Sequence, residues 1–205
     1  MTKVRIGIVG LGFGAEFIPI YQAHPDAELV AVAQRSEEDL NRIADHFAIP
    51  RRYTSLDEML ADPDIDAVHI NTPIGVHADQ SVAALNAGKH VACTVPMAVS
   101  IEDCARVVAA EEASGKTYMM METSVYTREF LFARRLVDDP AFGRIQFLRG
   151  AHMQEMAGWP DYWRTLPPMH YATHAVAPLL ALADAEARSV RAFGSGRVTS
   201  NDPSA

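Results

Sequence analysis

Residues 6–17 of this 205-residue chain read IGIVGLGFGAEF. An apolar run with β-branched side chains leads directly into Gly10, Gly12 and Ala15, the glycine spacing of a dinucleotide-binding turn between a strand and a helix. Gly10 permits the tight turn, Gly12 lets a pyrophosphate approach the backbone, and Ala15 keeps the helix close to the sheet. The free N–H groups at the start of the helix then face the phosphates. The stretch therefore predicts a dinucleotide site near the start of the chain.

Composition narrows the class of protein. About half of the chain is hydrophobic (49%), which allows a substantial core in one large or two small domains. The formal net charge is −8 and basic residues form no cluster, which argues against nucleic acid or an anionic membrane as partner. No apolar run reaches the length of a membrane span, and no signal-peptide core precedes the first strand. Cys93 and Cys104 are isolated and suit a reducing cytoplasm.

Strand and helix patterns alternate through residues 1–122. The strands are expected at residues 4–9, 29–33, 67–70, 90–93 and 117–121. The helices are expected at residues 13–23, 37–47, 56–61, 76–86 and 101–114. This alternation implies parallel βαβ units in an α/β, doubly wound Rossmann fold.

Ligands of such a sheet bind at the carboxyl ends of the strands. Two polar tripeptides, Asn71-Thr72-Pro73 and Thr94-Val95-Pro96, lie at two of these ends. The second strand ends at Gln34 and Arg35, where NAD enzymes commonly place a carboxylate for the ribose hydroxyls. Gln34 lacks the charge that repels a 2′-phosphate, and Arg35 can pair with one. The sequence therefore favours NADP, with NAD as the alternative.

The pattern changes after residue 122. A helix is expected over residues 128–137 and an apolar helix over 171–183, with long strands at 145–153 and 189–198. These elements indicate the start of a second unit, over residues 123–205, of the α+β type.

Several motifs together resemble a known family. They are Gly10-x-Gly12-x-x-Ala15, Asn71-Thr72-Pro73 with His77, Ala87-Gly88-Lys89-His90-Val91, Pro96-Met97-Ala98 and Phe142-Gly143-Arg144-Ile145. This order is similar to the Gfo/Idh/MocA family of glucose–fructose oxidoreductase and inositol dehydrogenase. The resemblance implies NAD(P)-dependent oxidation or reduction of sugars, cyclitols and related polyols. It also implies a partial substrate domain after residue 122, and a homo-oligomer formed through that domain's sheet if the domain is complete.

The candidate cofactor-binding residues follow from the turn, the strand ends and the resemblance. They are Gly10, Gly12, Phe13, Gly14, Ala15, Gln34, Arg35, Asn71, Thr72, Pro73, His77, Thr94, Val95 and Pro96.

The chain departs from the family pattern at three points. Members usually have Glu-Lys-Pro, whose lysine lies near the nicotinamide, where this chain has Thr94-Val95-Pro96. Val95 cannot donate a hydrogen bond or carry a charge. His174 matches the family's catalytic His, and His170 stands where an Asp often occurs. Family chains are also much longer, so only the beginning of the second domain is expected here.

His174 and His170 are the candidate catalytic residues. Oxidation of a carbinol needs a base for the hydroxyl proton, and an imidazole titrates near physiological pH. The spacing of the two residues predicts one shared helix face. The same spacing also suits a metal, which His152 or Glu155 would have to complete; we expect no metal.

An aromatic and polar segment precedes this helix. Its aromatic faces and hydrogen-bonding groups suit a sugar ring, although packing is an equal alternative. The candidate substrate contacts are Trp159, Tyr162, Trp163 and Arg164.

Three functions stay open at this point. The first is an NAD(P)-dependent oxidoreductase acting on a sugar or polyol. The second is a non-catalytic or regulatory nucleotide-binding protein, which Val95 and the short second domain favour. The third is a redox-initiated lyase or glycosidase that recycles its cofactor. Consumption of the cofactor distinguishes them, because only the first uses it stoichiometrically.

Overall fold

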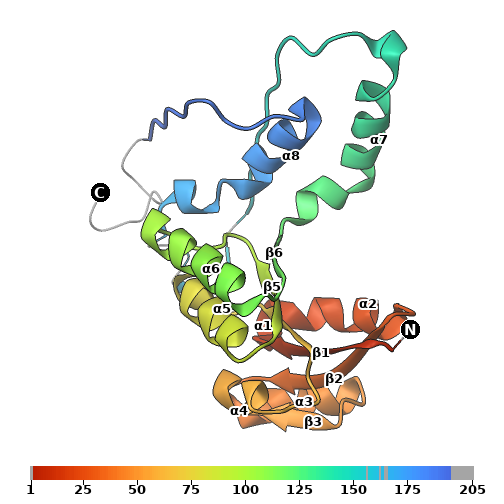
Figure 1. Ribbon diagram of the computed structural model, residues 1–205, viewed down its shortest axis with the longest axis vertical. Helices are drawn as coiled ribbons and strands as arrows, with labels where there is room; N and C mark the ends of the chain where they lie inside the picture. Colours follow the sequence, from red (N-terminus) through yellow and green to blue (C-terminus); the bar gives the residue numbers. More distant parts are fainter. Residues whose placement is uncertain (1, 156, 162, 164–165, 195–205) are drawn as a thin grey trace. The chain divides into compact units, whose positions relative to one another are not determined.

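The chain divides into two compact units, Met1–Met121 and Glu122–Ala205. The computed structural model describes residues 2–155, 157–161, 163 and 166–194. Each unit is described by itself below, with the element labels of Figure 1.

Six parallel strands form the sheet of the first unit, in the order β3-β2-β1-β4-β5-β6. In chain order they are β1 (Val4–Val9), β2 (Ala27–Ala33), β3 (Arg51–Tyr53), β4 (Ala67–Ile70), β5 (His90–Thr94) and β6 (Tyr118–Met121). β1 pairs with β2 on one side and with β4 on the other, so the strand order reverses at β1 and β4. The crevice at their carboxyl ends is where doubly wound sheets bind ligands. The predicted Rossmann fold is confirmed (Figure 1).

Helices connect these strands: α1 (Leu11–Gly14), α2 (Ile18–Ala23), α3 (Glu37–His46), α4 (Leu56–Leu60), α5 (His77–Asn86) and α6 (Ile101–Ser114). Two 3₁₀ turns add to them, η1 (Ala15–Phe17) and η2 (Ile74–Val76). Three helices begin at a serine whose Oγ accepts a hydrogen bond from a backbone N–H of the first turn: Ser36 for α3, Ser55 for α4 and Ser100 for α6. Each of these three helices therefore starts directly after a serine that can satisfy a free N–H group of its first turn.

Buried side chains cover both faces of the sheet. One cluster joins the sheet to α4, α5 and α6, with Met59, Leu85 and Val107 among its members. The other joins it to α2 and α3 through Ile18 and Leu40. A parallel sheet requires this arrangement, because its strands are apolar on both faces.

Lys89 is an unusual member of this interior. Its side chain is only 7% exposed. The Nζ atom donates hydrogen bonds to the carbonyl oxygens of Asp62 at 2.7 Å and Ile65 at 2.9 Å. These acceptors compensate the burial of the ammonium group and hold the loop before β4.

The second unit contains only helical elements within its described residues. They are α7 (Arg128–Val137), α8 (Thr173–Ala183) and the 3₁₀ turns η3 (Thr123–Tyr126), η4 (Pro140–Phe142) and η6 (Pro168–Tyr171). Helix α7 has the predicted bounds. Its N-cap is Thr127, whose Oγ1 accepts a hydrogen bond from the backbone N–H of Phe130.

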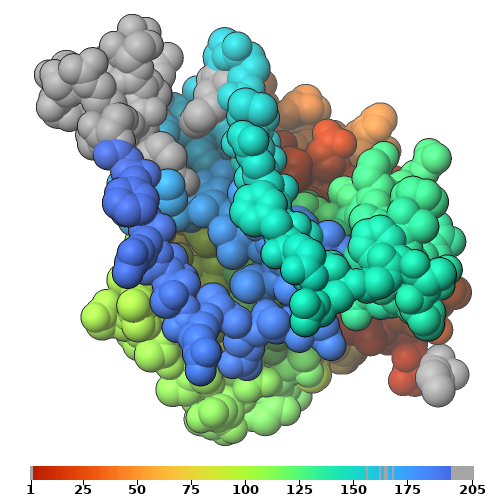
Figure 2. All heavy atoms as spheres, turned by 90° about the horizontal axis from the view of Figure 1, so that it is seen from above, coloured from red at the N-terminus to blue at the C-terminus, as the bar shows by residue number. Residues whose placement is uncertain are grey.

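Two predicted strands of this unit are wrong. Residues 145–153 and the described part of 189–198 have no regular secondary structure. Residues 145–153 lie at the surface in Figure 2, and Phe147 and Met153 are 81% and 89% exposed. The physical reason is that a strand is stabilised by a hydrogen-bonded neighbour, and neither segment has one among the described residues. The expected α+β character is therefore absent from this part of the structure.

Other differences from the sequence expectations are local. The helix expected over residues 13–23 is divided into α1, η1 and α2. Pro19 lies in the first turn of α2, where it cannot donate a hydrogen bond to the preceding turn. The short strand β3 was not predicted, because three residues carry no periodic signal. Helix α8 begins at Thr173, two residues after the predicted start.

One further property concerns the described helices. None of them combines the length and the apolar character that a membrane span requires.

Candidate functional site

The glycine turn after β1 has the geometry that its sequence predicts. Gly10 has a φ of +86°, and a Cβ atom there would lie 2.6 Å from the carbonyl oxygen of Asn71. Gly12 faces open space. A Cβ atom there would have no heavy atom of the described chain within 4 Å, apart from its immediate neighbours. The helix also lies close to the sheet at Gly14, where a Cβ would lie 3.0 Å from the Cγ2 atom of Ile8. Ala15, by contrast, is partly buried against the α2–α3 cluster.

Two polar groups beside this turn bear on whether it fits a dinucleotide. Both amide atoms of Asn71 are buried and lack a hydrogen-bond partner within the described chain. The Oε1 atom of Gln34 accepts a hydrogen bond from the backbone N–H of Leu11 at 3.2 Å. An open glycine, a helix start and an orphaned amide are the groups that an anionic, hydrogen-bonding ligand satisfies. The residues present therefore fit the phosphates of a dinucleotide.

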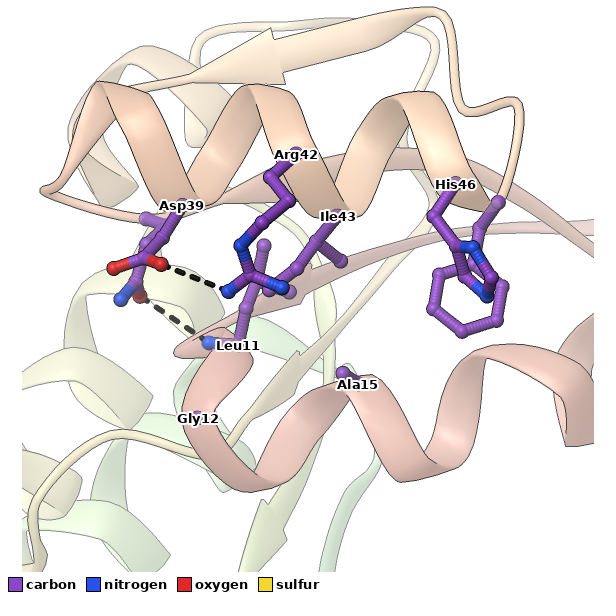
Figure 3. A pocket seen from close by; sticks show the side chains of 9 residues that line it. Leu11, Gly12, Ala15, Asp39, Arg42, Ile43 and His46 are labelled. Carbon is purple, nitrogen blue, oxygen red and sulfur yellow. Dashed lines mark hydrogen bonds and ion pairs between the residues drawn. The ribbon is translucent and has the colours of Figure 1, made fainter.

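A half-open hollow of about 400 Å³ lies next to the turn. Figure 3 shows it between α1 and α3, with Gly12 and Ala15 on one wall. Gln34 lines it from the end of β2, and Asp39 and Arg42 line it from α3. Arg42 donates from Nη2 to Asp39 Oδ1 at 2.8 Å. The hollow thus brings an amide, a carboxylate and a guanidinium close to the glycine turn.

The loops after β4 and β5 hold the other predicted cofactor residues of the sheet edge. Thr94 donates from Oγ1 to the carbonyl oxygen of Ile70 at 3.0 Å, which ties the two strand ends together. Val95 is buried, and the peptide bond between Val95 and Pro96 is cis. His77 is buried between the carbonyl oxygens of Thr72 and Pro96.

Besides Gly12, three predicted cofactor residues are exposed in this unit. They are Phe13, Arg35 and Pro73. The ring of Phe13 packs edge-on against Phe17, with centroids 5.2 Å apart. Exposure leaves these side chains accessible to a ligand at the sheet edge.

In the second unit, both ring nitrogens of His174 lie within hydrogen-bond distance of a polar side chain. Its Nδ1 atom lies 2.6 Å from Oε1 of Glu122, and its Nε2 atom lies 3.1 Å from the hydroxyl of Tyr171. Glu122 is 5% exposed. A carboxylate only accepts hydrogen bonds, so Nδ1 carries a proton, and in the neutral ring Nε2 is then the atom that accepts from Tyr171. The pair fixes one tautomer of His174.

Hydrogen bonds also keep Glu122 ionised. Burial raises the pKa of this carboxyl group, but hydrogen bonds from Ser124 and His174 outweigh that effect, so the pKa lies below its ordinary value. Ser124 donates to Oε1 from its backbone N–H at 2.9 Å and from its hydroxyl at 2.7 Å. The other oxygen, Oε2, is buried without a hydrogen-bond partner among the described residues.

The structure corrects the expected relation of His170 to His174. His170 lies on η6, which ends before α8 begins, so the two residues do not share a continuous helix. The reason is local: Pro167 precedes a 3₁₀ turn, and Ala172 interrupts the helical ladder as the N-cap of α8. The Nδ1 atom of His170 is buried without a partner in the described part of the chain.

A series of ring contacts connects the aromatic segment with His174. Ring centroids are 4.8 Å apart for Trp159 and Trp163, 4.9 Å for Trp163 and Tyr171, and 5.1 Å for Tyr171 and His174. Tyr162 and Arg164 lie outside the described residues. The rings of His152 and His174 are tilted by 48°, with centroids 4.8 Å apart. The described residues contain no group of three side chains that would hold a metal ion.

Glu122 and Tyr171 are site residues that the sequence reasoning missed. Glu122 is the first residue after β6, a lone carboxylate at the end of the apolar run Met119–Met121. The rule that singled out Asn71 and Thr94 at strand ends would also have found it. Tyr171 carried no signal of its own, because a tyrosine near an apolar helix is ordinary.

Comparison with known proteins identifies the relatives. Residues 4–122 match the Gfo/Idh/MocA model, described as an oxidoreductase family with an NAD-binding Rossmann fold. A glycosyl hydrolase family 109 protein of Shewanella baltica is 31% identical over 201 residues, which cover 87% of this chain and 44% of that protein. A 1-carboxy-3-chloro-3,4-dihydroxycyclohexa-1,5-diene dehydrogenase of Comamonas testosteroni is 32% identical over 146 residues, which cover 71% of this chain and 37% of that protein.

A solved structure shows the same fold. The scyllo-inositol dehydrogenase of Lactobacillus casei, with bound NAD(H) and scyllo-inositol, superposes with a TM-score of 0.64 and 29% identity. The match covers 70% of this chain and 43% of that one. The chain spans less than half the length of these relatives. The family model nevertheless covers more than half of the chain, and the sheet and its glycine turn agree with it. The chain therefore belongs to the Gfo/Idh/MocA family of oxidoreductases and has its NAD-binding Rossmann fold.

Proposed function

We propose that this protein is an NAD(P)-dependent oxidoreductase that acts on a C–OH group of a sugar, cyclitol or related polyol. Residues 1–122 bind the cofactor, and residues 123–205 contribute the part of the substrate domain present in this chain. The proposal is supported by family membership, by the open glycine turn and by relatives that include an inositol dehydrogenase.

The observation that carries the chemistry is the contact between His174 and buried Glu122. The carboxylate holds the proton on Nδ1 and leaves Nε2 as the basic atom. When bound, the nicotinamide ring accepts or supplies the hydride. His174 takes the proton of the substrate hydroxyl at Nε2, directly or through the hydroxyl of Tyr171. Val95 has no polar atom on its side chain, so the base must come from elsewhere.

The remaining candidate residues have supporting roles in this proposal. Gly10, Gly12 and Gly14 shape the turn for the pyrophosphate, and the amide of Asn71 gains a partner from the ligand. His170, Trp159 and Trp163 contact the sugar, as do Tyr162 and Arg164, which lie outside the described residues. We further propose that the protein is cytoplasmic and assembles as a homo-oligomer through its second domain.

For the cofactor we favour NADP over NAD. Arg35 is exposed beside Gln34, and a 2′-phosphate can pair with its guanidinium. Replacing Arg35 by Ala should weaken NADP binding by about 1.5–3 kcal/mol and NAD binding much less. Calorimetric titration of both cofactors measures this difference. The matched control is Arg106→Ala, which removes an exposed arginine paired with Asp79. Equal losses for both cofactors would remove Arg35 from the phosphate site.

The activity itself is tested by supplying NAD or NADP with a panel of sugars and cyclitols. An oxidoreductase forms one reduced cofactor for each alcohol oxidised. The proposal fails if the cofactor binds but no member of a broad panel changes its oxidation state. That result would support the non-catalytic binding protein instead.

A second function deserves the same experiment. The 31% identity with a glycosyl hydrolase family 109 protein favours a glycosidase or lyase that oxidises its sugar only transiently. Such an enzyme needs catalytic amounts of cofactor and releases product without net reduction. Cleavage of aryl glycosides with an unchanged cofactor would identify this alternative.

A further inference from the structure

Two opposite charges line the hollow beside the glycine turn (Figure 3). Asp39 and Arg42 lie three positions apart on α3, and the Nη2 atom of Arg42 lies 2.8 Å from Oδ1 of Asp39. Hydrogen bonds from Arg42 and Ser36 hold the pKa of Asp39 below its ordinary value, so this carboxylate is ionised near neutral pH. Arg35 is exposed but does not line the hollow. The guanidinium at the hollow is therefore that of Arg42.

A second helix carries the same local pattern. The spacing Ser-x-x-Asp-x-x-Arg starts both α3 and α6, at residues 36–42 and 100–106. In each helix the serine caps the first turn, and the aspartate pairs with the arginine, at 2.8 Å in α3 and 2.7 Å in α6. Of the two pairs, the one on α3 lines the hollow and the one on α6 does not. The pair on α6 is therefore a matched control for any binding role of the pair on α3.

The ion pair on α3 can be exchanged for another partner. The side chains of Arg42 and Asp39 are 68% and 47% exposed. An exposed ion pair contributes little to stability, because water solvates both charges. A phosphate group carries up to two negative charges and can accept two parallel hydrogen bonds from one guanidinium. A phosphate in the hollow is therefore a stronger partner for Arg42 than Asp39 is.

We propose that Arg42 binds the 2′-phosphate of NADP and that Asp39 restrains this preference, so that the pair determines the cofactor specificity. The inference rests on the proposed cofactor binding, in which the adenosine ribose lies at the end of β2, where Gln34 lines the same hollow. Gln34 carries no charge, whereas Asp39 repels the phosphate and competes with it for Arg42. With NAD, Arg42 stays paired with Asp39. The proposal adds a second cation to Arg35 on the side of the phosphate.

Two nucleotides that differ only in this phosphate test the proposal, adenosine 2′,5′-bisphosphate and adenosine 5′-monophosphate. Calorimetric titration measures their dissociation constants together with those of NADP and NAD. Arg42→Ala should raise the constants of the bisphosphate and of NADP about tenfold, with little change for the other two. Asp39→Asn should lower the same two constants about threefold, because the repulsion and the competition are both removed. Unchanged discrimination in these variants would overturn the proposal.

Further variants separate a binding role from a structural one. Arg106→Ala and Asp103→Asn alter the pair on α6 and should leave all four constants at their wild-type values. Arg42→Lys keeps the charge without the bidentate geometry, so its affinity for NADP should lie between those of the wild type and Arg42→Ala. Equal weakening of all four nucleotides in Arg42→Ala would show a structural role and overturn the proposal.

The wild-type titrations distinguish this inference from the proposed function. A chain that binds neither NADP nor NAD would overturn both. Normal binding of the cofactors without an effect of Arg42 on the phosphate would overturn this inference alone.

Discussion

At the scale of single residues, we expect Gly10 to be needed for the fold and Gly12 to be needed for dinucleotide binding. Both belong to the same motif, but a Cβ at Gly12 meets open space and a Cβ at Gly10 meets the backbone of Asn71 at 2.6 Å. Gly10 also has a positive φ, which L side chains rarely adopt. The difference agrees with the roles that the motif assigns, a tight turn at Gly10 and the approach of a pyrophosphate at Gly12.

We therefore expect Gly12→Val to abolish dinucleotide binding without loss of fold. The added side chain would occupy the space where a pyrophosphate approaches the backbone. Calorimetric titration measures the binding, and thermal unfolding monitors the fold. Gly10→Val is the matched comparison and should unfold at a clearly lower temperature. Normal cofactor affinity in Gly12→Val would show that the phosphates bind elsewhere.

The Glu122–His174 pair makes a second prediction at this scale. Replacing His174 by Ala should lower turnover about a hundredfold or more, with little change in cofactor affinity, because the base is removed. Glu122→Gln should also lower turnover. An amide can donate to Nδ1 as well as accept from it, so the variant no longer fixes the tautomer of His174. Steady-state kinetics with the true substrate measures both variants. Near-normal turnover in His174→Ala would refute this role and favour the non-catalytic protein.

At the scale of elements, local signals predicted the helices better than the strands of the second unit. Helix α6 starts after the cap residue Ser100 and ends at Gly115, which has the αL conformation. Both residue types mark helix ends in a sequence. Residues 145–153 have strand-like composition, yet whether they form a strand depends on a partner elsewhere in the chain. The contact between Glu122 and His174 is hidden for the same reason, since 52 positions separate the two residues.

The cap of α6 can be tested by itself. Ser100 accepts from the backbone N–H of Asp103 at 3.1 Å. Ser100→Ala should lower the free energy of unfolding by about 1 kcal/mol, because that N–H loses its partner. Ser100→Asp, which can also cap, should retain most of the stability. Denaturant titration measures the three chains, and equal stability of the alanine variant would show that the cap contributes nothing.

At the scale of the whole molecule, His69 couples stability to pH. It is fully buried in β4, and its Nδ1 atom lies 3.1 Å from the hydroxyl oxygen of Tyr21. Burial lowers the pKa of His69 to about 4. The unfolded chain binds a proton at this ring below about pH 6.5, but the folded chain does not until about pH 4. The stabilisation is therefore present above about pH 6.5 and is lost as the pH falls toward 4.

We expect the free energy of unfolding to fall by up to about 3 kcal/mol across this range through His69 alone. Denaturant titrations at several pH values measure the slope. His69→Asn should flatten it, whereas the exposed His24→Asn should not. An unchanged slope in His69→Asn would assign the acid sensitivity to other groups.

The buried ammonium of Lys89 has a consequence for the reactivity of the chain. There are three lysines, Lys3, Lys89 and Lys116, and only Lys89 is sealed beneath carbonyl oxygens. A water-borne acylating reagent meets Lys3 on the surface, but it reaches Lys89 only when the loop of Asp62 and Ile65 lifts away. The rate at which Lys89 is acylated therefore reports how often that loop opens, and it does so without any added probe.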